Sequence, residues 1–204
     1  GDVGNNRYGG QYAGGAEAVT FGEIITYGCT TTGCAGGKSA AEKLRIESYL
    51  AMKYGTTMRT TAGAAMDYKN SANTTVWNAT TAGTHTSRIA FIGQDDASAW
   101  RKTTSATIDF NSNEILSITN PTDLEDLEFA SIADDNGQKT TPASSNAPAG
   151  FQQRLVRSWK WQTVGGDGVG TVDLKFNLNN QSALPIAGAP TTYKVLFDAD
   201  GDFT

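Results

Sequence analysis

The chain of 204 residues carries a net charge of −5, and only 18% of its residues are charged. This length suits one large β domain or two small ones, and the acidic balance argues against a nucleic-acid partner, because phosphate binding requires a clustered basic face. No stretch approaches the ~20 apolar residues that cross a bilayer, so we expect no membrane insertion. The abundance of Gly, Thr, Ala, Ser and Asn is typical of extracellular β proteins with many turns.

The first 37 residues combine a glycine-rich start with a strand-like run and a cysteine loop. Residues 16–27 are rich in β-forming side chains and predict a strand. Cys29 and Cys34 follow in a Gly/Thr loop, and we interpret them as a short disulfide formed in an oxidising compartment, with two free thiols as the alternative. Zinc is disfavoured, because the single histidine, His85, is far away in the sequence.

Residues 39–54 predict one amphipathic helix. Ser39 is the expected N-cap, Glu42 three residues later completes a capping box, and Gly55 follows as the C-cap glycine. Apolar side chains that recur at near-helical spacing are interpreted as core packing: Leu44, Ala51 and Tyr54.

After Gly55 the pattern changes to short strands between polar turns. The expected strands are 74–79, 87–93, 105–110, 114–119, 127–133, 154–163, 169–176 and 192–198. This spacing predicts a mainly β protein, an antiparallel β-sandwich with one helix near residues 39–54. We divide the chain into the end of a jelly-roll-like segment with the cysteine loop, 1–37, and a helix plus sandwich module, 38–204, with one continuous domain as the alternative.

The sequence ends in a run of alternating aspartates, Asp198, Asp200 and Asp202, around Gly201. Such a turn can direct several oxygens at one hard cation, so these residues are our predicted Ca²⁺ ligands, with a plain acidic turn as the alternative. Two further acidic turns are weaker candidates for a cation site. They are Asp95 with Asp96, after a β run, and residues 134–137, for which a hairpin turn is the alternative.

Tryptophans are the candidate ligand-binding residues. Trp159 and Trp161 share one face of an alternating strand, and such a pair is either core or a platform for a sugar ring. Trp100 is a third candidate for an exposed aromatic. Signals for catalysis are weak: there is no nucleophile-elbow sequence and no histidine pair for a metal.

Several elements in order carry a family resemblance. Residues 16–27 resemble the closing strand of a concanavalin-like (laminin-G-like) jelly-roll domain, which in such proteins leads into a helix like that of residues 42–55. The resemblance continues through residues 76–79, 89–98, 157–161 and 196–203. This set is similar to an uncharacterised β-rich module of large bacterial cell-surface proteins and adhesins, over most of residues 16–204.

The resemblance implies an exported, multi-domain protein of the bacterial cell surface, and it supplies no catalytic residue. Both ends of the chain look cut, so we expect partners that are other surface-protein domains or copies of the chain itself, joined at an open sheet edge. We predict a non-catalytic extracellular structural or adhesive module that is stabilised by Ca²⁺, with assembly into a filament through edge-strand pairing as a further expectation. The alternative is a carbohydrate-binding module with exposed tryptophans, and a glycoside hydrolase with two converging carboxylates is a third reading.

Overall fold

The computed structural model describes residues 23, 25, 38–108, 115–137, 142, 143, 150, 154–177 and 194–198. The chain divides into two compact units, Gly1–Ala35 and Gly36–Thr204, and every helix and strand given below belongs to the second. The expected disulfide of Cys29 and Cys34 lies outside the described residues. So does the expected strand at 16–27, apart from Glu23 and Ile25, which lie in no strand.

The predicted helix is confirmed as α1, Ala40–Tyr54. The Ser39 hydroxyl accepts a hydrogen bond from the Glu42 amide at 3.2 Å, and the Glu42 carboxylate accepts one from the Ser39 amide at 2.9 Å, so the capping box is complete. These hydrogen bonds from the Ser39 amide and hydroxyl lower the pKa of Glu42 to about 2. Gly55 ends the helix in the left-handed conformation that glycine adopts without steric cost.

The remaining elements are short, as the spacing of turns predicted. In chain order they are β1 (Tyr68–Lys69), β2 (Thr75–Trp77), α2 (Ala79–Ala82), β3 (Ser87–Asp95), the 3-10 helix η2 (Asp96–Ser98), β4 (Trp100–Lys102), β5 (Thr104–Ala106), β6 (Leu116–Thr119), β7 (Phe129–Asp134), β8 (Pro142–Ala143), β9 (Arg154–Leu155), β10 (Trp159–Val164) and β11 (Asp173–Phe176). Among the helices of the described residues, none is long and apolar enough to cross a membrane.

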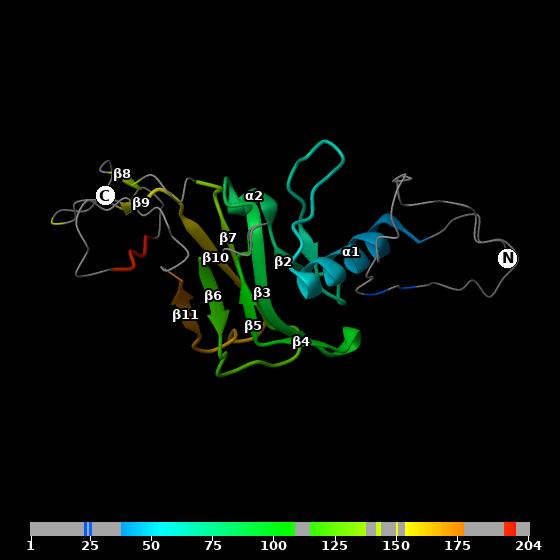
Figure 1. Cartoon of the computed structure of the whole chain (residues 1–204). Coiled ribbons are helices and arrows are strands. Elements are labelled where there is room, and N and C mark those ends of the chain that lie inside the picture. The colour runs from blue at the N-terminus through cyan, green and yellow to red at the C-terminus, as the bar shows by residue number, and fades with distance from the viewer. Residues whose placement is uncertain are drawn as a thin grey trace, which may run out of the picture. The chain divides into compact units, whose positions relative to one another are not determined.

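Two sheets make up the sandwich, and all their described pairings are antiparallel. The central sheet has the order β10-β7-β3-β4, and the second has the order β11-β6-β5. Figure 1 shows α1 and β2 on one side of β3 and β7, with β6 and β11 on the other. The chain is therefore an antiparallel β-sandwich whose central sheet is covered on both faces.

The two faces of the central sheet belong to separate cores. Along β3, Phe91 points into the first core, with α1, β1 and β2, while Ile92 points into the second, with β6. Such a double burial explains why β3 and β7 read as nearly continuous apolar runs rather than as alternating patterns. Tyr68 lies at 4.8 Å from Phe91, ring centre to ring centre, and its complete burial raises its pKa to about 12.

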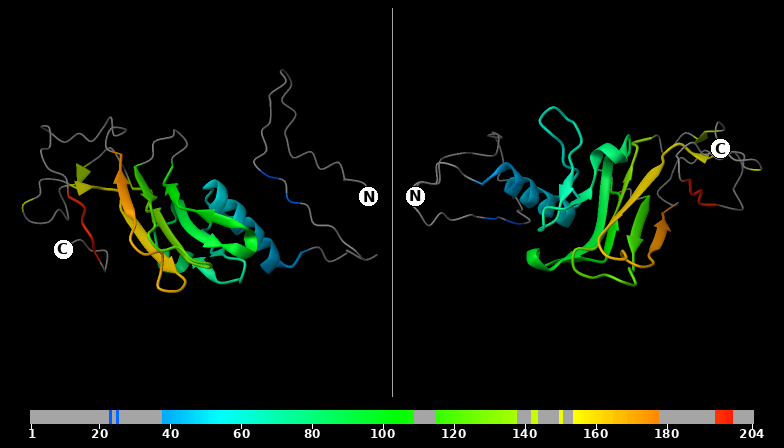
Figure 2. Two further views of the ribbon diagram at one scale, coloured as in Figure 1. Left: turned by 90° about the horizontal axis from the view of Figure 1, so that it is seen from below. Right: turned by 180° about the vertical axis from the view of Figure 1, so that it is seen from behind.

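One turn carries the chain from the central sheet to the second sheet. β4 pairs with β3, whereas β5, two residues on, pairs with β6, so the bend at Thr103 is a corner of the sandwich. At the opposite margin, β10 and β11 are the last strands of their sheets. In Figure 2, β10 (gold) runs into the loop at 165–172 and β11 (orange) leaves it. We call the margin formed by β10 and β11 the seam.

Several sequence predictions differ from the structure. Of the strand expected at 169–176, only Asp173–Phe176 forms a strand. The strand expected at 154–163 is interrupted at 156–158, because Arg157 and Ser158 there form side-chain contacts described below. Residues 194–198, expected as part of a strand, lie in no strand. The buried face of α1 consists of Ser48, Ala51 and Met52, while Tyr54 is 46% exposed and is no core residue.

Candidate functional site

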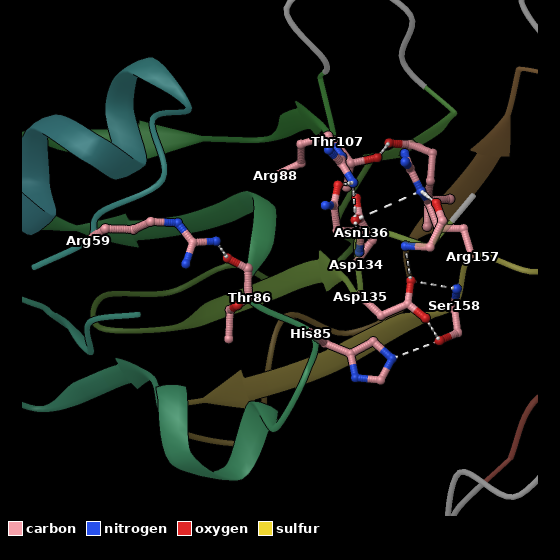
Figure 3. Close-up of polar contacts among 12 residues, drawn as sticks. Arg59, His85, Thr86, Arg88, Thr107, Asp134, Asp135, Asn136, Arg157 and Ser158 are labelled. Atoms are coloured by element: carbon pink, nitrogen blue, oxygen red, sulfur yellow. Dashed lines mark hydrogen bonds and ion pairs between the residues drawn. The ribbon is translucent and has the colours of Figure 1, made fainter. Parts of the chain in front are cut away.

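Ionisable and other polar side chains gather at one end of the central sheet, where β3 and β10 begin and β7 ends (Figure 3). We call this group the polar cluster: His85, Arg88, Asp134, Asp135, Asn136, Arg157 and Ser158. Strand pairing brings these positions together, since Asp134 pairs with both Ser87 and Trp159.

A fully buried carboxylate forms the centre of the polar cluster. Asp134 is completely buried and accepts from Arg88 at both oxygens, with a distance of 2.7 Å from Nε to Oδ2 and a shorter contact from Nη2 to Oδ1. The backbone amide of Asn136 donates to Asp134 Oδ1 at 2.8 Å. A bidentate arginine is the geometry that best compensates a carboxylate removed from water.

The backbone at Arg88 is shaped for this contact. The register of β3 against β7 shifts between Ser87 and Ala90, and Arg88 within the shift has a φ of 46°. A bulge of this kind re-aims a side chain at the end of a ladder, and the left-handed conformation costs on the order of 1–3 kcal/mol for a residue other than glycine. The conformation places the Arg88 guanidinium against Asp134.

A second arginine, Arg157, approaches Asp134 from the segment just before β10. Arg157 Nε lies 3.9 Å from Asp134 Oδ1 and donates to the Gly137 carbonyl at 2.9 Å. Both arginine side chains are largely buried, at 16% exposed for Arg88 and 7% for Arg157. One carboxylate between two guanidinium groups therefore joins β3, β7 and the start of β10.

The other half of the polar cluster is a chain of hydrogen bonds through a serine. The Ser158 hydroxyl donates to Asp135 Oδ2 at 2.8 Å, and His85 Nε2 lies 2.9 Å from the same hydroxyl. Because the hydroxyl proton is directed at Asp135, the histidine nitrogen acts as the donor to Ser158. Asp135 Oδ1 accepts from the Gly137 amide at 2.8 Å and from the Ser158 amide at 3.2 Å.

These contacts determine the direction in which the pKa of Asp135 is shifted. Partial burial by itself raises its pKa, but the hydrogen bonds from Gly137 and Ser158 and the nearby His85 outweigh burial, so the pKa is lowered. Asp135 is thus held in its ionised form by the groups that surround it.

The order of groups in this chain matters for chemistry. In a serine nucleophile system the histidine accepts the serine proton and a carboxylate orients the histidine. Here Ser158 lies between His85 and Asp135, and its proton points at the carboxylate. The arrangement ties the loop before β3 to the start of β10, and it does not present an activated hydroxyl.

Asp95, a predicted cation ligand, has structural partners. It is buried, and its Oδ1 accepts from the Ser71 hydroxyl at 2.6 Å while its Oδ2 accepts from the Ser71 amide at 2.9 Å. It also caps η2 through the Ser98 amide. Asp96 is exposed and its Oδ1 accepts from Gln94. The structure therefore separates the two neighbours, and their role as Ca²⁺ ligands stays a prediction.

The aspartate run at the end of the chain is described only in part. Asp198 belongs to the described residues, whereas Asp200 and Asp202 lie outside them. Within the described ranges, no three His, Cys, Asp or Glu side chains are grouped so that they could hold a metal ion. The Ca²⁺ assignment to Asp198, Asp200 and Asp202 thus rests on the sequence pattern.

The three candidate tryptophans lie in different surroundings. Trp100 is 5% exposed and stacks on Phe129 with ring centres 5.6 Å apart, so this candidate for an exposed aromatic is a core residue. Trp159 is half-buried in the second core and meets Phe176 edge to face at 6.1 Å. Trp161 is 37% exposed and is the one of the three that solvent reaches widely.

Sequence reasoning singled out residues 134–137 as an acidic turn but missed Arg88, Arg157 and Ser158 as its partners. One signal was available: Arg88 follows the first residue of one predicted strand, and Asp134 follows the last residue of another. In an antiparallel pair these two positions lie at the same end of the sheet, so opposite charges there predict an ion pair.

The fold and the polar cluster define a β-sandwich module in which ionisable side chains fasten strand ends together. Residues 42–204 match the model of the family described as Domain of unknown function (DUF8202). Because this match covers most of the chain, the chain belongs to that family. Neither the curated proteins nor the solved structures contain a match.

Proposed function

We propose that the chain is a non-catalytic structural or adhesive module of a bacterial cell-surface protein. The observation that carries the proposal is the use of the polar cluster: Asp134, Asp135 and Ser158 hydrogen-bond to other parts of the same fold. A site for chemistry on a bound substrate needs groups that are directed at the substrate, whereas these side chains are directed at each other. Mechanical fastening of strand ends suits a module that transmits or resists force.

Location is the first test of this proposal. An antibody raised against the chain is applied to intact, unpermeabilised cells of a bacterium that carries the full-length protein. The expected result is labelling of intact cells that is lost when surface proteins are shaved with protease before labelling. Labelling that requires lysis contradicts the surface assignment, and a cytosolic marker that stays unlabelled is the control for intact cells.

Stabilisation by Ca²⁺ forms the second part of the proposal, and it is supported by the aspartate run at residues 198–202. Calcium at ~100 times its dissociation constant raises the free energy of unfolding by ~2.7 kcal/mol. At this chain length that corresponds to a rise in Tm of roughly 5–11 °C. The paired substitution Asp200→Asn with Asp202→Asn is expected to remove that shift, while Asp167→Asn, in a different glycine-rich turn, keeps it. An unchanged Tm on adding calcium and then excess chelator contradicts this part alone.

A carbohydrate-binding module is the second candidate, and the exposure of Trp161 favours it. An exposed indole on a strand can stack on the apolar face of a sugar ring. A glycan array that compares the unaltered chain with Trp161→Ala tests it, with Trp100→Phe as a control at a buried tryptophan. Binding that is lost only in Trp161→Ala supports this candidate, and the absence of binding by the unaltered chain contradicts it.

A further inference from the structure

We infer that the seam of one chain accepts residues 194–198 of a second copy as an added β-strand, so that copies join head to tail. This inference rests on the proposed function and deepens it, because it names the partner and the two surfaces that meet. The seam is incompletely covered, residues 194–198 have strand character without lying in a strand, and the two match in size.

The seam is the margin at which the second core is least covered. Residues of that core on β3, β6 and β7 are 4% exposed or less. By contrast, the core-facing residues on β10 and β11 are only half-buried: Trp159, Leu174 and Phe176. Trp161, next on the same face of β10, is 37% exposed. The core is thus sealed at its centre and open along its edge.

Within the described part of the chain, no strand pairs with the outer side of β10. The Asp135 amide donates to the Ser158 carbonyl at 3.2 Å, which fixes the alternation of the ladder between β10 and β7. Residues two apart share this direction, so Lys160 and Gln162 bond towards β7, and Trp161 and Thr163 direct their N–H and C=O groups away from it. β10 is the last strand of its sheet, and such a row of groups is a template for strand addition.

A buried donor at the seam lacks an acceptor. The indole Nε1 of Trp159 is buried and has no hydrogen-bond partner among the residues that the structure describes. A buried polar group without a partner costs about 1–3 kcal/mol, and most such groups in proteins are satisfied. A carbonyl of an added strand that runs beside β10 is an acceptor of the required kind.

Residues 194–198, Lys-Val-Leu-Phe-Asp, have the composition of a strand. They lie in no strand of their own chain, and two apolar side chains on one face of the alternating pattern are exposed, Val195 at 51% and Phe197 at 85%. Phe197 is the most exposed of the large apolar residues in the described part of the chain. A strand-forming segment that exposes its apolar face is the usual donor in strand addition.

Size and connection favour a second copy as the partner. The segment of five residues matches β10, with six, and β11, with four. Since the same chain carries both the incomplete seam and the segment, and its own segment leaves Phe197 exposed, the seam of another copy is the complementary surface. Such a contact joins two different surfaces, so it is heterologous and builds an open chain of copies.

Sedimentation velocity on the 204-residue chain tests the inference, with two variants that block one surface each. Phe197→Asp spoils the donor and Trp161→Lys spoils the acceptor. The matched controls alter other large exposed apolar residues in the same way: Ile108→Asp, at 57% exposed, and Tyr54→Lys, at 46%. Circular dichroism and Tm establish that each variant is folded.

The expected results are specific to a head-to-tail contact. The unaltered chain and both controls show sedimentation coefficients that rise with concentration, while Phe197→Asp and Trp161→Lys stay monomeric. An equimolar mixture of the two blocked variants forms a dimer and nothing larger, because one variant retains a donor and the other retains an acceptor.

The backbone part of the inference has its own variant. Thr163→Pro removes an N–H that points away from β7, so it is expected to prevent association while the fold persists, whereas Thr163→Val keeps the N–H and associates normally. If folded Thr163→Pro associates as the unaltered chain does, strand addition at β10 is wrong.

Three outcomes overturn the inference and leave the proposed surface role standing. The first is an unaltered chain that stays monomeric at concentrations up to about 1 mM. The second is association that the control variants abolish equally. The third is a monomeric chain that binds a glycan through Trp161, which makes the seam a sugar site. Failure of the cell-labelling experiment, by contrast, removes the surface role whatever the association state.

Discussion

The two faces of the central sheet are closed in different ways. The first core, between this sheet and α1, β1 and β2, holds Trp77, Tyr68 and Phe91 at 1% exposure or less. In the second core, between the two sheets, the central side chains are similarly buried, but those on β10 and β11 are only half-buried. The partly buried apolar residues of the first core are spread over α1, the segment after it and β10: Tyr49, Met58 and Val164. Most of those of the second core lie on or beside β10 and β11: Trp159, Val172, Leu174 and Phe176. The contrast shows that the two faces of one sheet can differ in how far their margins are buried.

The largest effect is expected in the first core. Phe91→Ala removes a fully enclosed ring and lowers the free energy of unfolding by about 3–5 kcal/mol. The matched change at the seam, Leu174→Ala, removes a half-buried side chain and is expected to cost no more than about 2 kcal/mol. Urea unfolding followed by tryptophan fluorescence measures both. Equal losses at the two positions break the contrast between the faces.

The polar cluster gives an effect of similar size for a different reason. Asp134→Ala removes the carboxylate that compensates Arg88 and is expected to cost about 3–5 kcal/mol. Replacing both partners, Asp134→Leu with Arg88→Met, is expected to cost less than the single change, because the Arg88 guanidinium is removed together with its carboxylate. Arg157 loses its ion pair with Asp134 in both variants and keeps its hydrogen bond to the Gly137 carbonyl. The same urea experiment compares the two. A double variant that is less stable than Asp134→Ala contradicts this account.

A smaller effect depends on pH. The pKa of Asp135 is lowered in the folded chain, so its ionised form adds stability above its unfolded pKa of about 3.9, and that stability is lost as the pH falls through the folded pKa. At pH 7 Asp135→Asn is expected to cost on the order of 1.5 kcal/mol. The difference in unfolding free energy between this variant and the unaltered chain should shrink between pH 5 and pH 3. A difference that stays constant rules out the charge of Asp135 as its source.

The smallest effect is expected at the seam itself. Trp161→Ala removes a side chain that is 37% exposed at an edge, and for the monomer we expect a change of less than about 1 kcal/mol. Unfolding is measured at a concentration at which sedimentation shows a monomer. A loss as large as that of Phe91→Ala means that Trp161 belongs to the sealed core, and the two faces then cease to differ.

The sequence predicted best those elements whose signals are local. The capping residues Ser39, Glu42 and Gly55 set both ends of α1 without help from the rest of the fold. β3 and β7 appeared as long apolar runs because both of their faces are buried, and the structure confirms them. Such features depend on a few neighbouring residues, so they can be derived from the order of the amino acids.

Features that depend on partners far away in the sequence were predicted less well. The break at 156–158 arises because Ser158 bonds to Asp135, more than twenty positions earlier. Tyr54 fits the apolar spacing of α1 but is exposed, since the helix buries Ser48 and Met52 instead. The polar cluster was invisible as a group, because its members come from three segments and only strand register brings them together.

The placement of β7 has a consequence for how the chain folds. This strand is paired on both sides, with β3 earlier in the chain and β10 later, and both partners are separated from it by long stretches of sequence. Pairings of this kind close large loops before they gain contacts, so the sheet is expected to form in milliseconds to seconds, well after α1 with its local contacts. Until β7 has found both neighbours, its six buried residues stay exposed to other chains. The slow central strand is therefore the point at which newly made chains are most exposed to aggregation.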